Sequence, residues 1–219
     1  MAKSKSHIEK VPCRVKSFAH RYDYIIEMCR DKRVLHLGCV DSGLTGKKIR
    51  AGKFLHEKIK SISGELWGVD IDMEGINLLK SMNYTNLIFG DVENLQGVEG
   101  LRGKEFDIII ASELIEHLSN PGLFLASLKP YFSGNTLLII TTPNAQKITD
   151  IKYRLKGYEL VHPDHNFWFS YRTLKSLLEK NGYKIIDAAV YGKGKSLLKR
   201  YFSRRLPFLL DGLIFTVRP

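Results

Sequence analysis

Apolar residues along the chain fall into short continuous runs that alternate with longer segments in which apolar residues recur at helical spacing. The runs predict five strands, at residues 33–38, 65–70, 86–91, 106–112 and 135–142. The helically spaced segments predict helices at residues 20–31, 47–62, 74–82, 120–128 and 171–182. Asn120 and Ser170 are residue types that cap helix N-termini, Pro121 suits a first helical position, and Gly182 suits a helix end.

The C-terminal part predicts two further strands, residues 183–190 and 213–218, with a basic helix at 196–202 between them. Strands that alternate with helices and carry continuous apolar runs are typical of a parallel sheet covered on both faces. We therefore predict a doubly wound, Rossmann-like α/β fold. Its seven-stranded sheet is mostly parallel, and the closing strands pair antiparallel at one edge. No repeat or low-complexity linker is found, which favours one domain over residues 1–219 with a polar, basic lead-in at 1–19.

Residues 143–169 show no clear helix or strand pattern. A stretch of this length is uncommon in a compact domain unless it serves as a lid or binding loop. We predict that it crosses the cofactor end of the sheet as a lid or substrate loop. Phe169 is expected to pack in the core and Trp168 to face a substrate, and Arg154 and Lys156 could meet an anionic acceptor.

The composition is that of an ordinary globular protein, with 219 residues, 44% apolar and 26% charged. No apolar run is long enough for a membrane span, and the first residues lack the apolar centre of a signal peptide. The three cysteines form no C-x-x-C pair, which indicates reduced thiols. These features together predict a cytoplasmic protein.

The net charge of +11 changes this picture, because Lys and Arg concentrate at residues 3–33, 47–60 and 192–205. A basic surface attracts nucleic acid, anionic lipid or phosphorylated substrates, and the basic tail could touch an anionic surface. A solvated face without a specific partner has the same composition, so the charge alone does not decide the function.

Acidic residues close most of the predicted strands. The first strand ends in Gly38, whose missing side chain allows a ligand close to the backbone. The following strands end in Asp70, Asp91 and Ser112-Glu113. In open α/β sheets, ligands bind outside the carboxyl ends of the strands. We therefore expect a negatively charged rim at that place, with Asp70 positioned to accept hydrogen bonds from two ribose hydroxyls.

This rim argues against a phosphate ligand. The segment GLTGKKI at residues 43–49 lacks the spacing of a P-loop. The turn after the first strand is not G-x-G-x-x-G, and His36 and Asp70 are 34 positions apart, against about 20 in a dinucleotide fingerprint. An adenosine ligand without phosphates and with a cationic centre, such as S-adenosylmethionine, suits the rim better.

Six segments resemble class I S-adenosylmethionine-dependent methyltransferases over roughly residues 30–219. They are VLHLGC, LWGVDID, FGDVENL, FDIIIASELIEHLSNPGLFL, LLIITTPNA and HPDHNFWFSYRTLKSLLEKNGY. The last three are similar to bacterial methyltransferases of polysaccharide and secondary-metabolite pathways and to ubiquinone-pathway O-methyltransferases. The resemblance implies that Gly38 shapes the turn at the methionine side, that Asp70 holds the ribose, that Asp91 and the backbone of Val92 read the adenine, and that Glu113 lies near the methionine end. The predicted cofactor-binding residues are Leu37, Gly38, Cys39, Asp70, Ile71, Asp91, Val92 and Glu113.

The chain departs from the family at the first turn. His36 stands where the family usually has an acid that orders the turn and the ammonium group of the cofactor, and a neutral imidazole supplies no such charge. Val40 replaces the second turn glycine, and Asp41 could restore the missing charge.

The segment ELIEHL places Glu113, Glu116 and His117 at helical spacing, and HPDH supplies His162 and His165. Carboxylates and imidazoles together can hold a divalent metal. Small-RNA terminal 2′-O-methyltransferases resemble this pattern, with a Glu-x-x-Glu-His group and a downstream His that hold a metal. Glu-His after this strand is nevertheless common in the superfamily without a known metal. We therefore predict no metal and take His117, His165 and His162 as the candidate catalytic residues.

Methyl transfer to a hydroxyl requires alignment of the acceptor and removal of its proton, and histidine has a pKa suited to that base role. We predict an enzyme that O-methylates a hydroxyl of a small molecule or glycan precursor. One alternative is a metal-assisted RNA 2′-O-methyltransferase, favoured by the charge but lacking a separate RNA-binding module. A second alternative is a catalytically silent cofactor-binding partner subunit, motivated by His36 and the altered turn.

Overall fold

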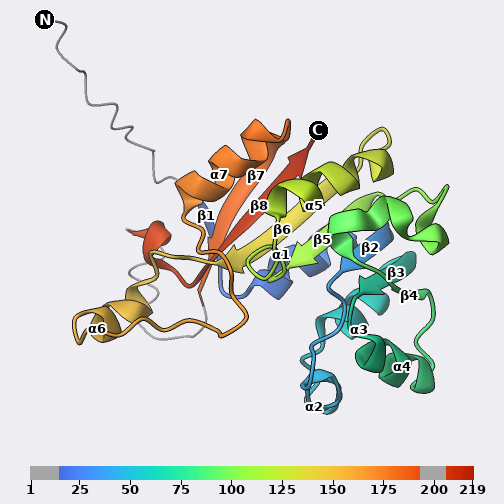
Figure 1. The fold of residues 1–219 in the computed structure, drawn as a ribbon, viewed down its shortest axis with the longest axis horizontal. Helices are drawn as coiled ribbons and strands as arrows, with labels where there is room; N and C mark the ends of the chain where they lie inside the picture. Colours follow the sequence, from blue (N-terminus) through green and yellow to red (C-terminus); the bar gives the residue numbers. More distant parts are fainter. Residues whose placement is uncertain (1–14, 193–205) are drawn as a thin grey trace, which may run out of the picture.

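The computed structural model describes residues 15–192 and 206–219, and these form one eight-stranded sheet flanked by helices (Figure 1). The strands are β1 (Lys16–Phe18), β2 (Arg33–Leu37), β3 (Glu65–Asp70), β4 (Leu87–Phe89), β5 (Ile108–Ser112), β6 (Leu137–Pro143), β7 (Lys184–Tyr191) and β8 (Gly212–Arg218). The α-helices are α1 (Arg21–Cys29), α2 (Thr45–Arg50), α3 (Leu55–Lys60), α4 (Met73–Ser81), α5 (Pro121–Leu128), α6 (Ile151–Arg154) and α7 (Tyr171–Lys180).

The strand order is β1-β7-β8-β6-β5-β2-β3-β4. β8 runs antiparallel to both β6 and β7, whereas the other pairings are parallel. The predicted doubly wound, mostly parallel α/β fold is therefore confirmed, including the antiparallel pairing of the two closing strands. The structure adds an eighth strand, β1, which pairs with β7 and lies within the segment predicted as a polar lead-in.

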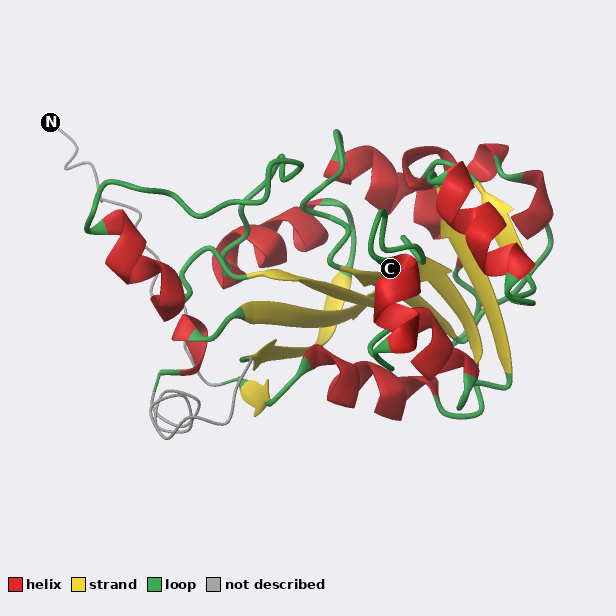
Figure 2. Ribbon diagram, turned by 90° about the horizontal axis from the view of Figure 1, so that it is seen from below, coloured by secondary structure: helices red, strands yellow, loops and turns green. Residues whose placement is uncertain are grey.

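The continuous apolar runs are explained by burial on both faces of the sheet. On β5, Ile109 points into a core formed with α5 and α7, and its neighbours Ile108 and Ile110 point into a second core formed with α1 and α3. Successive residues of a strand face opposite sides, so a strand covered on both sides must be apolar at every position. The helices on the two sides of the strands are visible in Figure 2.

Helix limits follow local signals in several places. Asn120 caps α5 through its side-chain oxygen, with Pro121 at the first helical position, and Ser170 caps α7 by accepting from the amide of Thr173. The predicted helix over 47–62 is wrong as one element. It is divided into α2 and α3, because Gly52 takes φ +61° between them, a conformation that ends a helix.

Two further predictions concern the connections. Residues 143–169 are mostly irregular as expected, although they contain the short helix α6. The predicted basic helix at 196–202 lies outside the described residues. Among the helices of residues 15–192 and 206–219, none is long and apolar enough to cross a membrane.

Candidate functional site

The turn that follows β2 brings the backbone to the carboxyl end of the sheet. Gly38 has φ +66°, and a Cβ built there would lie 3.0 Å from Cδ1 of Leu114. Its amide donates to the carbonyl of Val69 on β3 over 2.9 Å. A side chain at position 38 is thus disfavoured by both the backbone conformation and the available space, which agrees with the predicted role of Gly38 in shaping this turn.

Asp70 joins the ends of β2 and β3. Oδ2 accepts from the amide of Val40 over 2.8 Å, and Oδ1 accepts from the amide of Asp72 over 2.9 Å. Asp70 is buried, and this burial raises the pKa of its carboxyl group, although these amides act in the opposite direction. Each carboxylate oxygen has a second lone pair. The two oxygens can therefore still accept hydrogen bonds from a diol placed at the rim.

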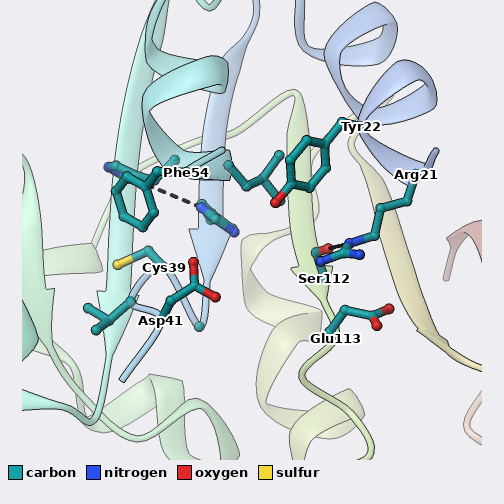
Figure 3. Close-up of a pocket in the computed structure, with 12 residues that line it drawn as sticks. Arg21, Tyr22, Cys39, Asp41, Phe54, Ser112 and Glu113 are labelled. Carbon is teal, nitrogen blue, oxygen red and sulfur yellow. Dashed lines mark hydrogen bonds between the residues drawn. The ribbon is translucent and has the colours of Figure 1, made fainter. Parts of the chain in front are cut away.

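A pocket lies between the turn after β2 and the end of β5, and the partly buried Arg21 forms one of its walls (Figure 3). Arg21, the first residue of α1, reaches across the sheet and donates from Nε to Oγ of Ser112 over 3.1 Å. Burial on its own would lower the pKa of Arg21, but the Glu113 carboxylate beside it, with smaller contributions from other neighbours, keeps the pKa raised. Among the described residues that line the pocket, Arg21 is thus the fixed cation, and Asp41 and Glu113 are the acids.

Glu113 directly follows β5 in an uncommon backbone conformation, with φ +55°. Its Oε1 accepts from the Tyr191 hydroxyl over 2.8 Å and from Oγ1 of Thr141 over 3.1 Å. Burial and the adjacent Glu113 carboxylate hold the pKa of Tyr191 well above its ordinary value, so Tyr191 remains a hydrogen-bond donor. These contacts fix the Glu113 carboxylate at the pocket, while its predicted place near the methionine end of the cofactor stays a prediction.

His36 is buried beneath the turn and pairs with another buried histidine. Its Nδ1 lies 3.1 Å from Nδ1 of His56, and the two rings are stacked. Burial and the neighbouring His56 hold the pKa of His36 well below its ordinary value, and burial lowers the pKa of His56 to about 4. Both imidazoles are therefore neutral at neutral pH. Asp41, which also lines the pocket, carries the negative charge on this side and forms an ion pair with Lys48.

The predicted adenine side lies at the ends of β3 and β4. Ile71 is exposed beyond Asp70, and Val92 is buried. Asp91 is exposed and accepts from the amide of Glu93 over 2.8 Å through Oδ1. Phe89, at the end of β4, is also exposed. A flat aromatic base placed here would meet the exposed side chains of Ile71 and Phe89 on its faces and the Asp91 carboxylate at its polar edge.

Three histidines predicted to be catalytic lie together at the end of β5. The rings of His117 and His165 are 4.6 Å apart, and that of His162 lies 5.7 Å from His117 and 5.3 Å from His165. One nitrogen from each histidine falls within 4.8 Å of the others. Burial, with the neighbouring imidazoles adding to it, lowers the pKa of His117 and of His165. These two rings are therefore mostly unprotonated at neutral pH and can accept a proton.

Asn166 holds the loop that supplies His162 and His165 against the segment after β5. Its amide donates to the Glu116 carbonyl over 2.8 Å, and its side-chain nitrogen donates to the His117 carbonyl over 2.8 Å. This contact brings two histidine-bearing segments together, although they are distant in the sequence.

The Glu116 carboxyl group is buried near Thr142 and Glu113 and is not part of the histidine cluster. Oε2 accepts from Oγ1 of Thr142 over 2.9 Å, whereas Oε1 has no hydrogen-bond partner within the part of the chain that the structure describes. Burial, followed by the charge of Glu113, raises the pKa of Glu116 to about 8. Glu116 is therefore mostly protonated at neutral pH.

Of the side chains predicted for the loop over residues 143–169, Phe169 lies where the sequence predicted. Phe169 is buried in the core with α7. Trp168 is partly exposed and lies near His165 and the ammonium group of Lys147. Arg154 donates to the carbonyl of Ala145 over 2.6 Å.

Three residues of this region, Arg21, His56 and Tyr191, were not predicted from the sequence. The one local signal was Arg21 itself, because a cation at the N-terminus of a helix opposes the helix dipole and needs another reason to be there. His56 and Tyr191 carry no such signal, since their positions depend on which helix and strand the sheet brings to the pocket.

Comparison with known proteins agrees with this geometry. Residues 17–188 match the sequence model of a family described as "Methyltransferase domain". A small RNA 2′-O-methyltransferase of Tetrahymena thermophila is 25% identical over 204 residues, covering 84% of this chain and 47% of the relative. A ubiquinone biosynthesis O-methyltransferase of Bartonella quintana is 23% identical over 169 residues, covering 71% and 61%. The chain thus spans about half to three fifths of the length of these curated relatives.

Solved structures show the same fold. The small RNA methyltransferase HEN1 has a TM-score of 0.61 at 20% identity and covers 90% of this chain and 24% of its own. An S-adenosylmethionine-dependent methyltransferase of Archaeoglobus fulgidus has a TM-score of 0.60 at 20% identity and covers 91% and 90%. The family match spans most of the chain, the strand-end pocket suits the cofactor, and the chain therefore belongs to the S-adenosylmethionine-dependent methyltransferases.

Proposed function

We propose that this methyltransferase O-methylates a hydroxyl of a small molecule or glycan precursor, with a histidine of the cluster formed by His117, His162 and His165 as the base. The observation that carries the proposal is that three imidazoles, two of them with lowered pKa, gather beside the cofactor pocket. An acceptor hydroxyl has to lose its proton as it takes the methyl group, and a neutral imidazole can accept that proton.

The chain's own side chains divide the binding of the cofactor between them. Asp70 takes the ribose hydroxyls on its free lone pairs, and Asp91 with the backbone of Val92 takes the adenine. Arg21 pairs with the carboxylate of the methionine part, because it is the cation of the pocket wall and lies next to Glu113. Asp41 and Glu113 face the ammonium and sulfonium charges. Leu37, Gly38 and Cys39 supply the close backbone of the turn, and Ile71 covers the adenine ring.

The transfer is an in-line displacement, in which the acceptor oxygen attacks the methyl carbon while the bond to sulfur breaks. The electrophile arrives activated, so the protein chiefly has to align the acceptor at about 3–3.5 Å and keep water away. We assign the first part of this task to the loop over residues 143–169, which carries His162 and His165 and is tied down by Asn166.

A second candidate, metal-assisted methylation of an RNA 2′-hydroxyl, is favoured by one observation. Three imidazole nitrogens, one each from His117, His162 and His165, lie within 4.8 Å of one another. Imidazole nitrogens are common ligands of divalent transition metals. The residues present therefore fit such an ion, with His117, His162 and His165 as its ligands. A bound ion would supply Lewis-acid activation of a ribose hydroxyl.

One experiment separates the candidates. The protein is incubated with radiolabelled S-adenosylmethionine and, in parallel, with phenolic and sugar acceptors and with short RNAs that end in a 2′-hydroxyl or in a 2′-deoxy nucleotide. Transfer to a small hydroxyl acceptor that persists after prolonged chelation supports the main proposal. Transfer only to the 2′-hydroxyl RNA, lost on chelation and restored by Mn²⁺, Co²⁺ or Mg²⁺, supports the second.

The third interpretation, a catalytically silent cofactor-binding subunit, gives a different result. Calorimetry would then detect S-adenosylmethionine binding, yet no acceptor in cell extract would take up label. Label uptake that disappears in a His117→Gln, His165→Gln double variant with unchanged cofactor affinity contradicts the silent interpretation.

A further inference from the structure

One exposed segment, residues 151–161, belongs to the 143–169 loop but lies outside the pocket lining and the histidine cluster. This arm, as we name the segment, comprises α6 and the chain that follows it up to Val161. Figures 1 and 2 both show α6 standing away from the sheet at one end of the molecule. None of the residues of α6 is buried. The arm therefore has a surface that contributes little to the core.

The arm is apolar to an unusual degree for so exposed a segment. Leu155 is 83% exposed and Tyr158 is 66% exposed. Ile151, Leu160 and Val161 are exposed as well. Scattered exposed apolar residues are ordinary, but several that follow one another along one protrusion indicate an interaction site.

Cations are interleaved with these apolar residues. Lys152, Arg154 and Lys156 are exposed on the arm, against the single acid Glu159. The whole chain carries a net charge of +11. An arrangement of aliphatic and aromatic side chains among Lys and Arg is typical of segments that lie in the interface of an anionic bilayer, where the apolar groups enter the lipid and the cations meet the headgroups.

The backbone holds this arrangement in one shape. Gly157 takes φ +80°, the amide of Gly157 donates to the carbonyl of Arg154, and the amide of Tyr158 donates to the carbonyl of Tyr153. These bonds close the end of α6 as a helix C-cap does. Leu155 and Tyr158 are therefore presented together without the cost of ordering a loose loop.

We propose that the arm docks the enzyme on an anionic lipid surface, with Leu155 and Tyr158 inserted at the interface and Lys152 and Lys156 against the headgroups. Charge complementarity selects this partner, and the exposed aliphatic groups favour lipid over RNA, since a phosphate backbone would leave them in water. His162 directly follows the arm, so docking brings the histidine cluster close to the bilayer. The proposal does not depend on which acceptor is methylated.

The test uses the full chain and sedimentation with vesicles of phosphatidylcholine alone or mixed equally with phosphatidylglycerol. The wild-type protein should sediment with the mixed vesicles and should not sediment with vesicles of phosphatidylcholine alone. Leu155→Glu should weaken binding about ten-fold, because it removes an apolar side chain from the interface and adds a repelled charge. Replacing Lys152 and Lys156 by Gln should weaken binding about 25-fold, since each cation near such a surface accounts for about a five-fold factor.

Leu78→Glu is the matched control, because Leu78 is an exposed leucine on α4, away from the arm in Figure 1. It should bind vesicles as wild type does, and both leucine variants should keep the S-adenosylmethionine affinity of wild type by calorimetry. No binding of wild type to anionic vesicles overturns the proposal. So does a result in which the Lys variants bind weakly but Leu155→Glu binds like Leu78→Glu, because the arm would then be a purely electrostatic surface of the kind that nucleic acid uses.

Discussion

Replacing Asp70 by Asn directly tests the proposal that Asp70 binds the ribose hydroxyls of S-adenosylmethionine. Both carboxylate oxygens already accept a backbone amide, from Val40 and from Asp72, and the ribose would use the remaining lone pairs. The Asn side chain keeps the size but loses the charge and replaces one acceptor oxygen by a donor. Hydrogen bonds to a charged acceptor contribute roughly 1.5–3 kcal/mol, so S-adenosylmethionine affinity should fall about 10- to 150-fold.

The measurement is calorimetric titration of wild type and variant at equal ionic strength, with thermal unfolding of each. Some stability should also be lost, roughly 1–3 kcal/mol, because one buried amide no longer faces an acceptor. Asp72→Ala is the control, since the Asp72 carboxylate beside the same turn is already used by the Gly75 amide at the cap of α4 and by the Ser42 hydroxyl. It should lose about 1 kcal/mol of stability and little affinity. Wild-type affinity in a folded Asp70→Asn protein would refute the assignment of Asp70 to the ribose.

Three further predictions follow from other parts of the site. His117→Gln or His165→Gln should keep cofactor affinity while kcat falls about 10²- to 10⁴-fold, and the wild-type rate should rise with pH through an inflection below 6.5, because the pKa of each imidazole is lowered. Arg21→Gln should weaken S-adenosylmethionine binding about ten-fold or more but leave 5′-methylthioadenosine unaffected in the same titration, since that ligand lacks the carboxylate. Burial and Glu113 raise the pKa of Glu116 from 4.5 to about 8, so at pH values between these two the folded protein binds a proton that the unfolded chain releases. The free energy of unfolding should therefore fall as pH rises from 4.5 to about 8. In the Glu116→Gln variant, the unfolding temperature should depend less on pH over that range.

Local signals in the sequence predicted much of the fold. Each face of the central sheet is buried, so the strands had to be continuously apolar, and the caps at Asn120 and Ser170 satisfy amides within three residues of themselves. The division between α2 and α3 was missed because Gly52 is tolerated inside a helix at a modest energetic cost, and only its backbone conformation ends the helix. The strand β1 was missed because a strand of three residues is too short to show the alternation or the continuous apolar run by which strands are recognised in a sequence.

The candidate site was predictable where it lies at strand ends and unpredictable where it depends on tertiary contacts. Asp70 ends one predicted strand and Glu113 directly follows another, so parallel pairing alone brings them to one rim. Arg21 meets Ser112 across 91 positions of sequence, and no local pattern specifies that contact. The histidines are an intermediate case, since their motifs were visible but their convergence requires Asn166 to fix one segment on the other.

The altered first turn moves the negative charge of the pocket away from position 36. A cationic cofactor still needs an acidic counter-charge, which Asp41 and Glu113 have to supply. With His36 and His56 neutral and buried, the floor under the turn offers no counter-charge to a cationic cofactor. Asp41 lines the same pocket three residues after Gly38, although its ion pair with Lys48 reduces its field. Glu113 accepts hydrogen bonds from Tyr191 and Thr141. Its cationic neighbour is Arg21, which we assign to the cofactor carboxylate, so the charge of Glu113 remains available to the cationic part of the cofactor.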